Sequence, residues 1–233
     1  MVRRRMGCQI VKRIRCRGVC TATRRVILTP RRLLKNISGF GRPIRGSRRS
    51  LGLQRGDMVA LIGTNRPQLY WVFFASQSLG AIPVPIYQDG IPAELEFVLN
   101  HAGVRFAVVE DQEQADKLLA IKEQCPALEA IIYSDTKGMR HSPESFLYSY
   151  ADVQEQGRQY DAEHADFFEE ELASGQADEV AGIFYTSGTT GEPKGVQLTS
   201  ANLLGSAEAC IAQEGLGSAD RQVNYAPMAW IGD

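Results

Sequence analysis

The residues with the clearest chemical potential form one segment, Tyr185-Thr-Ser-Gly-Thr-Thr-Gly-Glu-Pro-Lys-Gly195. Its three glycines permit backbone conformations and close approaches that other residues do not allow, and successive N–H groups in such a turn can bind an anion. Hydroxyl groups and one ammonium group add donors and a positive charge, from Thr186, Ser187, Thr189, Thr190 and Lys194. Close donors together with a compensating charge are what a polyphosphate needs. The segment therefore predicts a phosphate-binding loop.

Other glycine-rich motifs fit this segment poorly. A Walker loop needs Gly-Lys-Ser/Thr at the start of a helix, whereas Glu192 and Pro193 follow Gly191 here. The dinucleotide pattern and the nucleophile elbow also fail to match, and no histidine stands in a recognisable arrangement with Ser187. A plain hairpin turn remains the simplest alternative, because Gly and Thr are common in turns, but such a turn requires neither four hydroxyls nor a lysine.

The residues around the loop predict the elements that position it. An apolar run at residues 179–185 is suited to a buried strand that leads into the loop, and residues 196–199 resemble a return strand. Upstream, short apolar runs alternate with helical patterns. We expect strands at residues 58–63, 105–110 and 128–133, and helices at residues 66–79, 92–101 and 112–124.

This β-α-β-α-β order predicts an α/β fold with a mostly parallel sheet and helices on both faces. Residues 81–86 contain Pro83 and Pro85 and therefore predict an extended segment at the edge of the sheet. Residues 138–178 are polar and acidic. The three glutamates at 169–171 are expected on the solvated face of a helix rather than in a metal site.

The charge distribution divides the chain near residue 50. Residues 1–50 hold 16 of the 26 basic residues and none of the 27 acidic ones. This leader is compatible with a disordered or non-native tail, with an organelle transit peptide, or with a tail that binds nucleic acid or anionic lipid. It lacks a sustained amphipathic stripe, so we favour the first interpretation and expect no nucleic-acid partner. The folded part is then residues 51–233.

Cysteine and histidine spacing gives no sign of a structural framework. The five cysteines and three histidines show neither a disulfide pattern nor metal-ligand spacing. The most apolar stretch, residues 69–87, is interrupted by proline and glycine and is too short to span a bilayer, and no secretory signal is present. We therefore expect a cytoplasmic protein, with room for peripheral association at the inner membrane.

Residues 186–195 closely resemble the phosphate loop of the adenylate-forming superfamily, which includes acyl-CoA synthetases, luciferases and peptide-synthetase adenylation domains. Further agreement with this family is found at residues 51–60, 65–68, 198–204 and 226–231. The resemblance is nearest to bacterial long- or medium-chain fatty acyl-CoA synthetases. It implies the N-terminal part of the acyl-activating enzyme fold, built from mostly parallel sheets with flanking helices.

The resemblance also implies a two-step ligase of the long-chain fatty acid–CoA ligase type, which uses ATP, Mg²⁺ and coenzyme A with a fatty acid as its small-molecule substrates. ATP-phosphate binding would fall to Thr186, Ser187, Gly188, Thr189, Thr190, Gly191 and Lys194. Thr186 would also help to ligate magnesium, and Lys194 would neutralise phosphate charge or order the loop. Trp230 would line the substrate pocket, although an isolated aromatic residue can equally belong to a core.

Several family motifs lie downstream of the part that this chain resembles. They include the magnesium-binding glutamate, the ribose-binding aspartate and the domain with the adenylation lysine. We therefore expect residues 51–233 to be a partial N-terminal AMP-binding domain, without a complete catalytic set and inactive alone. The alternative is a non-catalytic nucleotide-binding or interaction module. Neither the acyl chain length nor the oligomeric state follows from the sequence.

Overall fold

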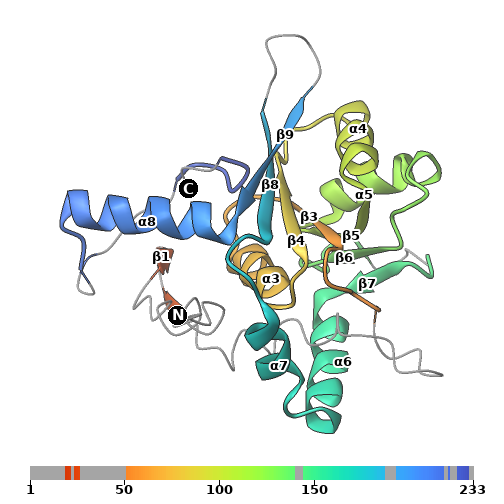
Figure 1. Cartoon of the computed structure of the whole chain (residues 1–233). Helices are drawn as coiled ribbons and strands as arrows, with labels where there is room; N and C mark the ends of the chain where they lie inside the picture. The colour runs from red at the N-terminus through yellow and green to blue at the C-terminus, as the bar shows by residue number, and fades with distance from the viewer. Residues whose placement is uncertain are drawn as a thin grey trace.

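A five-stranded parallel sheet forms the centre of the molecule in the computed structural model (Figure 1). The structure describes residues 19–21, 24–26, 51–139, 144–186, 193–217, 220 and 225–230. The strands are β3 (Met58–Ile62), β4 (Ile82–Ile86), β5 (Val104–Val109), β6 (Ala130–Tyr133) and β7 (Leu147–Ser149), in the order β4-β3-β5-β6-β7. All four pairings are parallel. The predicted α/β class is therefore confirmed.

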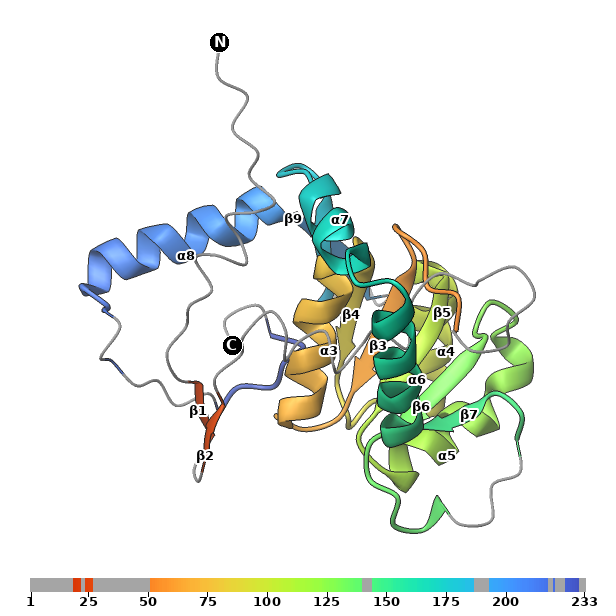
Figure 2. The same ribbon diagram turned by 90° about the horizontal axis from the view of Figure 1, so that it is seen from below.

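Helices cover both faces of this sheet, as the alternating sequence predicted. They are α3 (Pro67–Ser78), α4 (Pro92–Ala102), α5 (Gln112–Ala120) and α6 (Tyr150–Glu163). The chain moves from β3 to β4 and then crosses back over β3 to β5, so right-handed connections place α3 and α4 on opposite faces. Side chains of α3 and α6 accordingly share one buried cluster, and those of α4 and α5 share another. Figure 2 shows both layers.

Strand β4 lies at the edge of the parallel sheet, where its two prolines belong. It pairs with β3 through residues 82–86, and neither Pro83 nor Pro85 has an N–H to offer a second neighbour. On that free side lies β8 (Val180–Thr186), beside β4 but without a strand pairing to it. The side chain of Gln77 on α3 reaches across and donates to the carbonyl of Ala181 at 2.7 Å.

Strand β8 forms an antiparallel pair with β9 (Lys194–Thr199), which confirms the predicted strand–loop–strand arrangement. Helix α8 (Ser200–Glu214) follows, and it extends away from the central sheet in both ribbon views (Figures 1 and 2). The Thr199 hydroxyl accepts from the N–H of Asn202 at 3.2 Å and so caps its N-terminus. No residue of α8 is buried against the described part of the chain.

Three local predictions need correction. The helix expected at residues 112–124 ends at Ala120 and continues as a short 3₁₀ helix, η2 (Lys122–Gln124), because the chain approaches Pro126 and Cys125 must leave the helical region. The acidic stretch also contains β7 and α6, which polar composition concealed. Finally, Glu171 in α7 (Phe167–Ser174) forms an ion pair with Arg55 at 3.1 Å, so it does not belong to a wholly solvated face.

Within the basic leader, β1 (Val19–Thr21) pairs antiparallel with β2 (Arg24–Val26). These two strands are the only residues of 1–50 that the structure describes, and the division at residue 50 remains a prediction. In the part of the chain that the structure describes, no helix combines the length and the apolar character needed to cross a membrane.

Candidate functional site

The root of the predicted phosphate loop is formed by two residues on neighbouring strands. Thr186 ends β8, Lys194 begins β9, and the two stand directly opposite each other in the register of the pair. Residues opposite each other in such a pair leave the same face of the sheet, with their Cβ atoms about 5 Å apart. Both are exposed. A hydroxyl and an ammonium group therefore share one solvent-accessible position.

The remaining loop residues predicted to bind phosphate are Ser187, Gly188, Thr189, Thr190 and Gly191, and they lie outside the described residues. What the structure does establish is how firmly Thr186 is supported. The preceding residues of β8, from Ala181 to Phe184, are buried. The buried part of β8 therefore fixes the position at which the loop begins, at the exposed Thr186.

A pocket of about 610 Å³ opens beside this root. Its wall is mainly apolar, with Ile86, Leu95, Val98, Phe184 and Trp230 among the lining residues, and Tyr185, Thr186 and Glu94 add polar atoms. An apolar wall with a few convergent polar groups is the usual character of a small-molecule site. Trp230, predicted to line a substrate pocket, lies in this wall with 57% of its surface exposed.

The carboxyl ends of β3 and β5, where open parallel sheets often bind ligands, are occupied by the chain's own side chains. Glu110 accepts from the N–H and hydroxyl of Thr64 at 2.6 and 2.7 Å, and from Arg66 at 2.5 Å. Burial alone would raise the pKa of Glu110, but these hydrogen bonds and the Arg66 charge outweigh it and hold the pKa below its usual value. The Glu110 carboxylate therefore has a structural role, since it links the end of β5 to the turn after β3.

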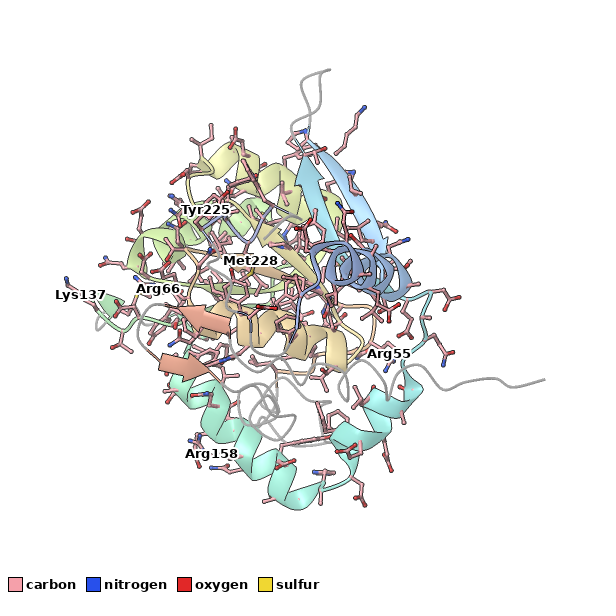
Figure 3. The ribbon with its side chains drawn as sticks, turned by 90° about the vertical axis from the view of Figure 1, so that its left-hand side faces the viewer. Arg55, Arg66, Lys137, Arg158, Tyr225 and Met228 are labelled. Atoms are coloured by element: carbon pink, nitrogen blue, oxygen red, sulfur yellow. The ribbon has the colours of Figure 1, made fainter. Side chains whose placement is uncertain are left out.

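The same end of the sheet fixes the segment that carries Trp230. Asn65, which follows β3, donates to the carbonyl of Ala226 at 2.7 Å, and Met228 is buried in the cluster beneath α3. Figure 3 labels Met228 and Arg66 in this region. The hydrogen bond from Asn65 and the buried side chain of Met228 therefore hold the segment with Trp230 against the parallel sheet.

The structure does not by itself build a magnesium site. Among the described residues, no group of three or more histidine, cysteine or acidic side chains could hold a metal ion. Magnesium bound with a nucleotide is usually held by one or two carboxylates together with the phosphates, and the exposed hydroxyl of Thr186 supplies only one oxygen. The predicted role of Thr186 fits only an ion whose other ligands come from elsewhere.

Sequence reasoning missed the residues that face the loop root from α4. The phenol oxygen of Tyr185 lies 2.7 Å from Nδ1 of His101, a contact between residues 84 positions apart. It also overlooked Gly90 and Glu94, which line the pocket after β4. The run Gly90-Ile-Pro92 after an apolar strand was the available signal, since it marks a turn that leads into a helix.

Comparison with known proteins gives a consistent family. The sequence profile of the family described as AMP-binding enzyme matches residues 42–233. The match begins inside the segment assigned to the leader. Over 185 residues the chain is 31% identical to the peroxisomal long chain acyl-CoA synthetase 6 of Arabidopsis thaliana, covering 77% of this chain and 25% of that protein.

A long-chain-fatty-acid–CoA ligase of Rattus norvegicus is 32% identical over 188 residues, covering 78% of this chain and 27% of the ligase. The chain thus spans about a quarter of the length of these curated relatives. The crystal structure of an anthranilate CoA ligase in complex with anthranoyl-AMP shares the fold. Its TM-score is 0.62 at 23% identity, over 87% of this chain and 36% of that one.

Proposed function

Because this chain belongs to the AMP-binding enzyme family, we propose that it forms the ATP-phosphate side of the active site in a fatty acid–CoA ligase. The observation that carries this proposal is the position of Thr186 opposite Lys194 at the root of the glycine-rich loop. Both groups can reach the same phosphate, one as a hydroxyl donor and the other as a charge. The relatives named as long-chain ligases support the acid and the thiol as the two further substrates.

The proposed reaction has two steps. A carboxylate oxygen of the acid attacks the α-phosphorus of ATP, which forms an acyl-adenylate and releases pyrophosphate. The sulfur of coenzyme A then attacks the acyl carbon, which forms the thioester and releases AMP. In the first step negative charge leaves with pyrophosphate, so the ammonium group of Lys194 and the hydroxyl of Thr186 would stabilise the leaving group.

The pocket beside the loop root supports an acid with an apolar tail. Its wall contains Leu95, Val98 and Phe184, and Thr186 also lines it. A substrate whose apolar part lies along this wall would bring its carboxylate toward the phosphates without burying an unpaired charge. Trp230 is placed to contact such a tail.

Calorimetry with ATP on the chain itself tests the phosphate site. Lys194→Met should weaken ATP binding about 10-fold or more, because a charge-assisted hydrogen bond contributes about 1.5–3 kcal/mol. Lys137→Met is the matched control: Lys137 is also an exposed lysine, and it lies far from the β8–β9 pair in Figure 3. Equal affinities for the two variants would reject the assignment of Lys194.

Carboxylate-dependent exchange between ATP and labelled pyrophosphate tests the ligase reaction, in the full-length protein that carries this sequence. Exchange that requires a long-chain fatty acid supports the proposal. ATP binding without exchange for any acid from short to long chain would instead favour the alternative, a nucleotide-binding module that does not catalyse. Failure to bind ATP in either form would reject both.

A further inference from the structure

His101 on α4 and Tyr185 on β8 are in contact at the root of the loop. Nδ1 of His101 lies 2.7 Å from the hydroxyl oxygen of Tyr185, and the two rings meet edge to face at 82° with their centres 5.7 Å apart. The bond can form with either tautomer of the imidazole, since a phenol both donates and accepts. Tyr185 immediately precedes Thr186, so this contact acts at the last residue before the loop's first hydroxyl.

The Tyr185 ring is also held from the neighbouring strand. Tyr185 stands opposite Gly195 in the register, and a Cβ atom built on Gly195 would lie only 3.1 Å from Cζ of the tyrosine and 3.0 Å from Cγ2 of Ile183. Most real Cβ contacts are longer than this, so the ring packs closely on Gly195, and a side chain at that position would require the ring or Ile183 to move by a few tenths of an ångström. The next pair toward the loop is Thr186 with Lys194.

His101 is in turn supported within its own helix. Phe97, one turn earlier, stacks on the imidazole with an angle of 18° and a centre distance of 5.5 Å. Residues four apart lie above one another on a helix, so this pair fixes the rotamer of His101. The same helix lines the pocket through Leu95 and Val98.

We propose that His101 is a positioning residue for the phosphate loop: through Tyr185 it fixes the root of the β8–β9 pair against α4, and so sets where Thr186 and Lys194 stand relative to the pocket. The expected effect on ATP binding rests on the proposed function. The position of Tyr185 against α4 is independent of that function, because it follows from the contacts of Tyr185 with His101 and Gly195.

Three variants separate positioning from general stability. His101→Leu removes the hydrogen bond but keeps an apolar contact for Phe97. His101→Asn offers a polar atom close to the place of Nδ1 and should restore the bond. Asn100→Leu is the control, because Asn100 lies next to His101 on α4 but donates to the carbonyl of Gln124 at 3.0 Å, away from the loop.

Hydrogen exchange of the backbone amides gives a readout that does not need a nucleotide. His101→Leu should speed exchange at residues 184–186 and 194–196 by about three- to tenfold, which corresponds to the net free energy of one hydrogen bond. Strand β5 should be unaffected. His101→Asn should show exchange rates close to those of the parent protein, and Asn100→Leu should not change the exchange rates at the root. Unchanged exchange at the root in His101→Leu would overturn the proposal.

ATP affinity provides the functional readout on the same proteins. His101→Leu should raise the ATP dissociation constant about three- to tenfold, with recovery in His101→Asn. The double variant with His101→Leu and Tyr185→Phe should lose no more ATP affinity than the weaker-binding single variant, because both changes remove the same hydrogen bond. If exchange at the root rises while ATP affinity stays the same, the proposal fails. If the parent protein binds no ATP but the root exchanges faster, the positioning contact stands and the proposed function is what fails.

Discussion

Glu110 illustrates how a single side chain can secure an end of the sheet. It follows β5, and its carboxylate accepts three hydrogen bonds from the turn after β3, two from Thr64 and one from Arg66. Its side chain is only 12% exposed, whereas that of Arg66 is 60% exposed. The carboxylate is therefore nearly buried and depends on these donors, because burying an unpaired charge is costly.

The lowered pKa of Glu110 predicts a specific dependence of stability on pH. A carboxyl whose pKa is lower in the folded protein adds stability above its unfolded pKa of about 4.3, and this stability is lost as the pH falls through the folded value. Glu110→Gln should lower the free energy of unfolding at neutral pH by about 1–3 kcal/mol. It should also flatten the loss of stability on acidification below about pH 5.

Urea unfolding between about pH 3 and pH 7 measures both effects. Glu155→Gln is the comparison, because Glu155 pairs with Arg158 on the exposed surface of α6 and should have little influence on stability. An acid dependence that is the same in Glu110→Gln and in the parent protein would contradict the assignment.

At the scale of elements, α8 differs from every other long helix of the described chain. Helices α3 and α4 bury three or more residues each, whereas α8 buries none, although it has a capping hydroxyl at one end and Gly215 in a left-handed conformation at the other. Caps contribute about 1 kcal/mol each, but most helical stability in proteins comes from packing of an apolar face. Helix α8 therefore has capping residues at both ends but no apolar face packed against the described part of the chain.

We therefore expect α8 to exchange its backbone amides much faster than α3 in this chain. Mass spectrometry of hydrogen exchange resolves the two helices, and α3 should show protection close to that of global unfolding. Thr199→Ala should accelerate exchange in α8 further, because it removes the capping hydroxyl, with no change in α3. Equal protection of α3 and α8 would show that α8 is packed in solution.

At the scale of the whole molecule, Arg55 joins parts of the chain that are far apart in sequence. Its guanidinium donates to the carboxylate of Glu179 at 2.9 Å, to that of Glu171 at 3.1 Å and to the hydroxyl of Ser174 at 2.5 Å. The residue precedes β3, whereas its partners belong to α7 and to the approach to β8. Arg55 thus connects the parallel sheet with the strand that carries the loop.

Replacing Arg55 should destabilise the molecule more than replacing an ordinary surface arginine. Arg55→Met should lower the free energy of unfolding by about 1–2 kcal/mol, because the partly buried carboxylates of Glu171 and Glu179 each lose an ion pair with the guanidinium. Arg158→Met is the control, since Arg158 pairs with Glu155 within α6 and both are about half exposed. Figure 3 labels both arginines. Equal destabilisation in urea would show that the Arg55 contacts carry no special weight.

The sequence by itself determined the elements around the loop and the class of fold. Apolar runs, proline and glycine act locally, so their positions along the chain were enough to indicate β8, β9, the parallel sheet and the edge position of β4. Polar composition hid α6 and β7, because the buried residues of α6, among them Val153 and Tyr160, are spread through an acidic segment.

Only the tertiary structure decided which side chains meet. The register that sets Thr186 opposite Lys194, the contact of Tyr185 with His101 and the contact of Arg55 with Glu179 all join residues through space. Such pairs depend on how strands cross over and how helices pack, and no local pattern specifies them. The loop could therefore be predicted from its own residues, whereas the groups that hold its root against α4 could not.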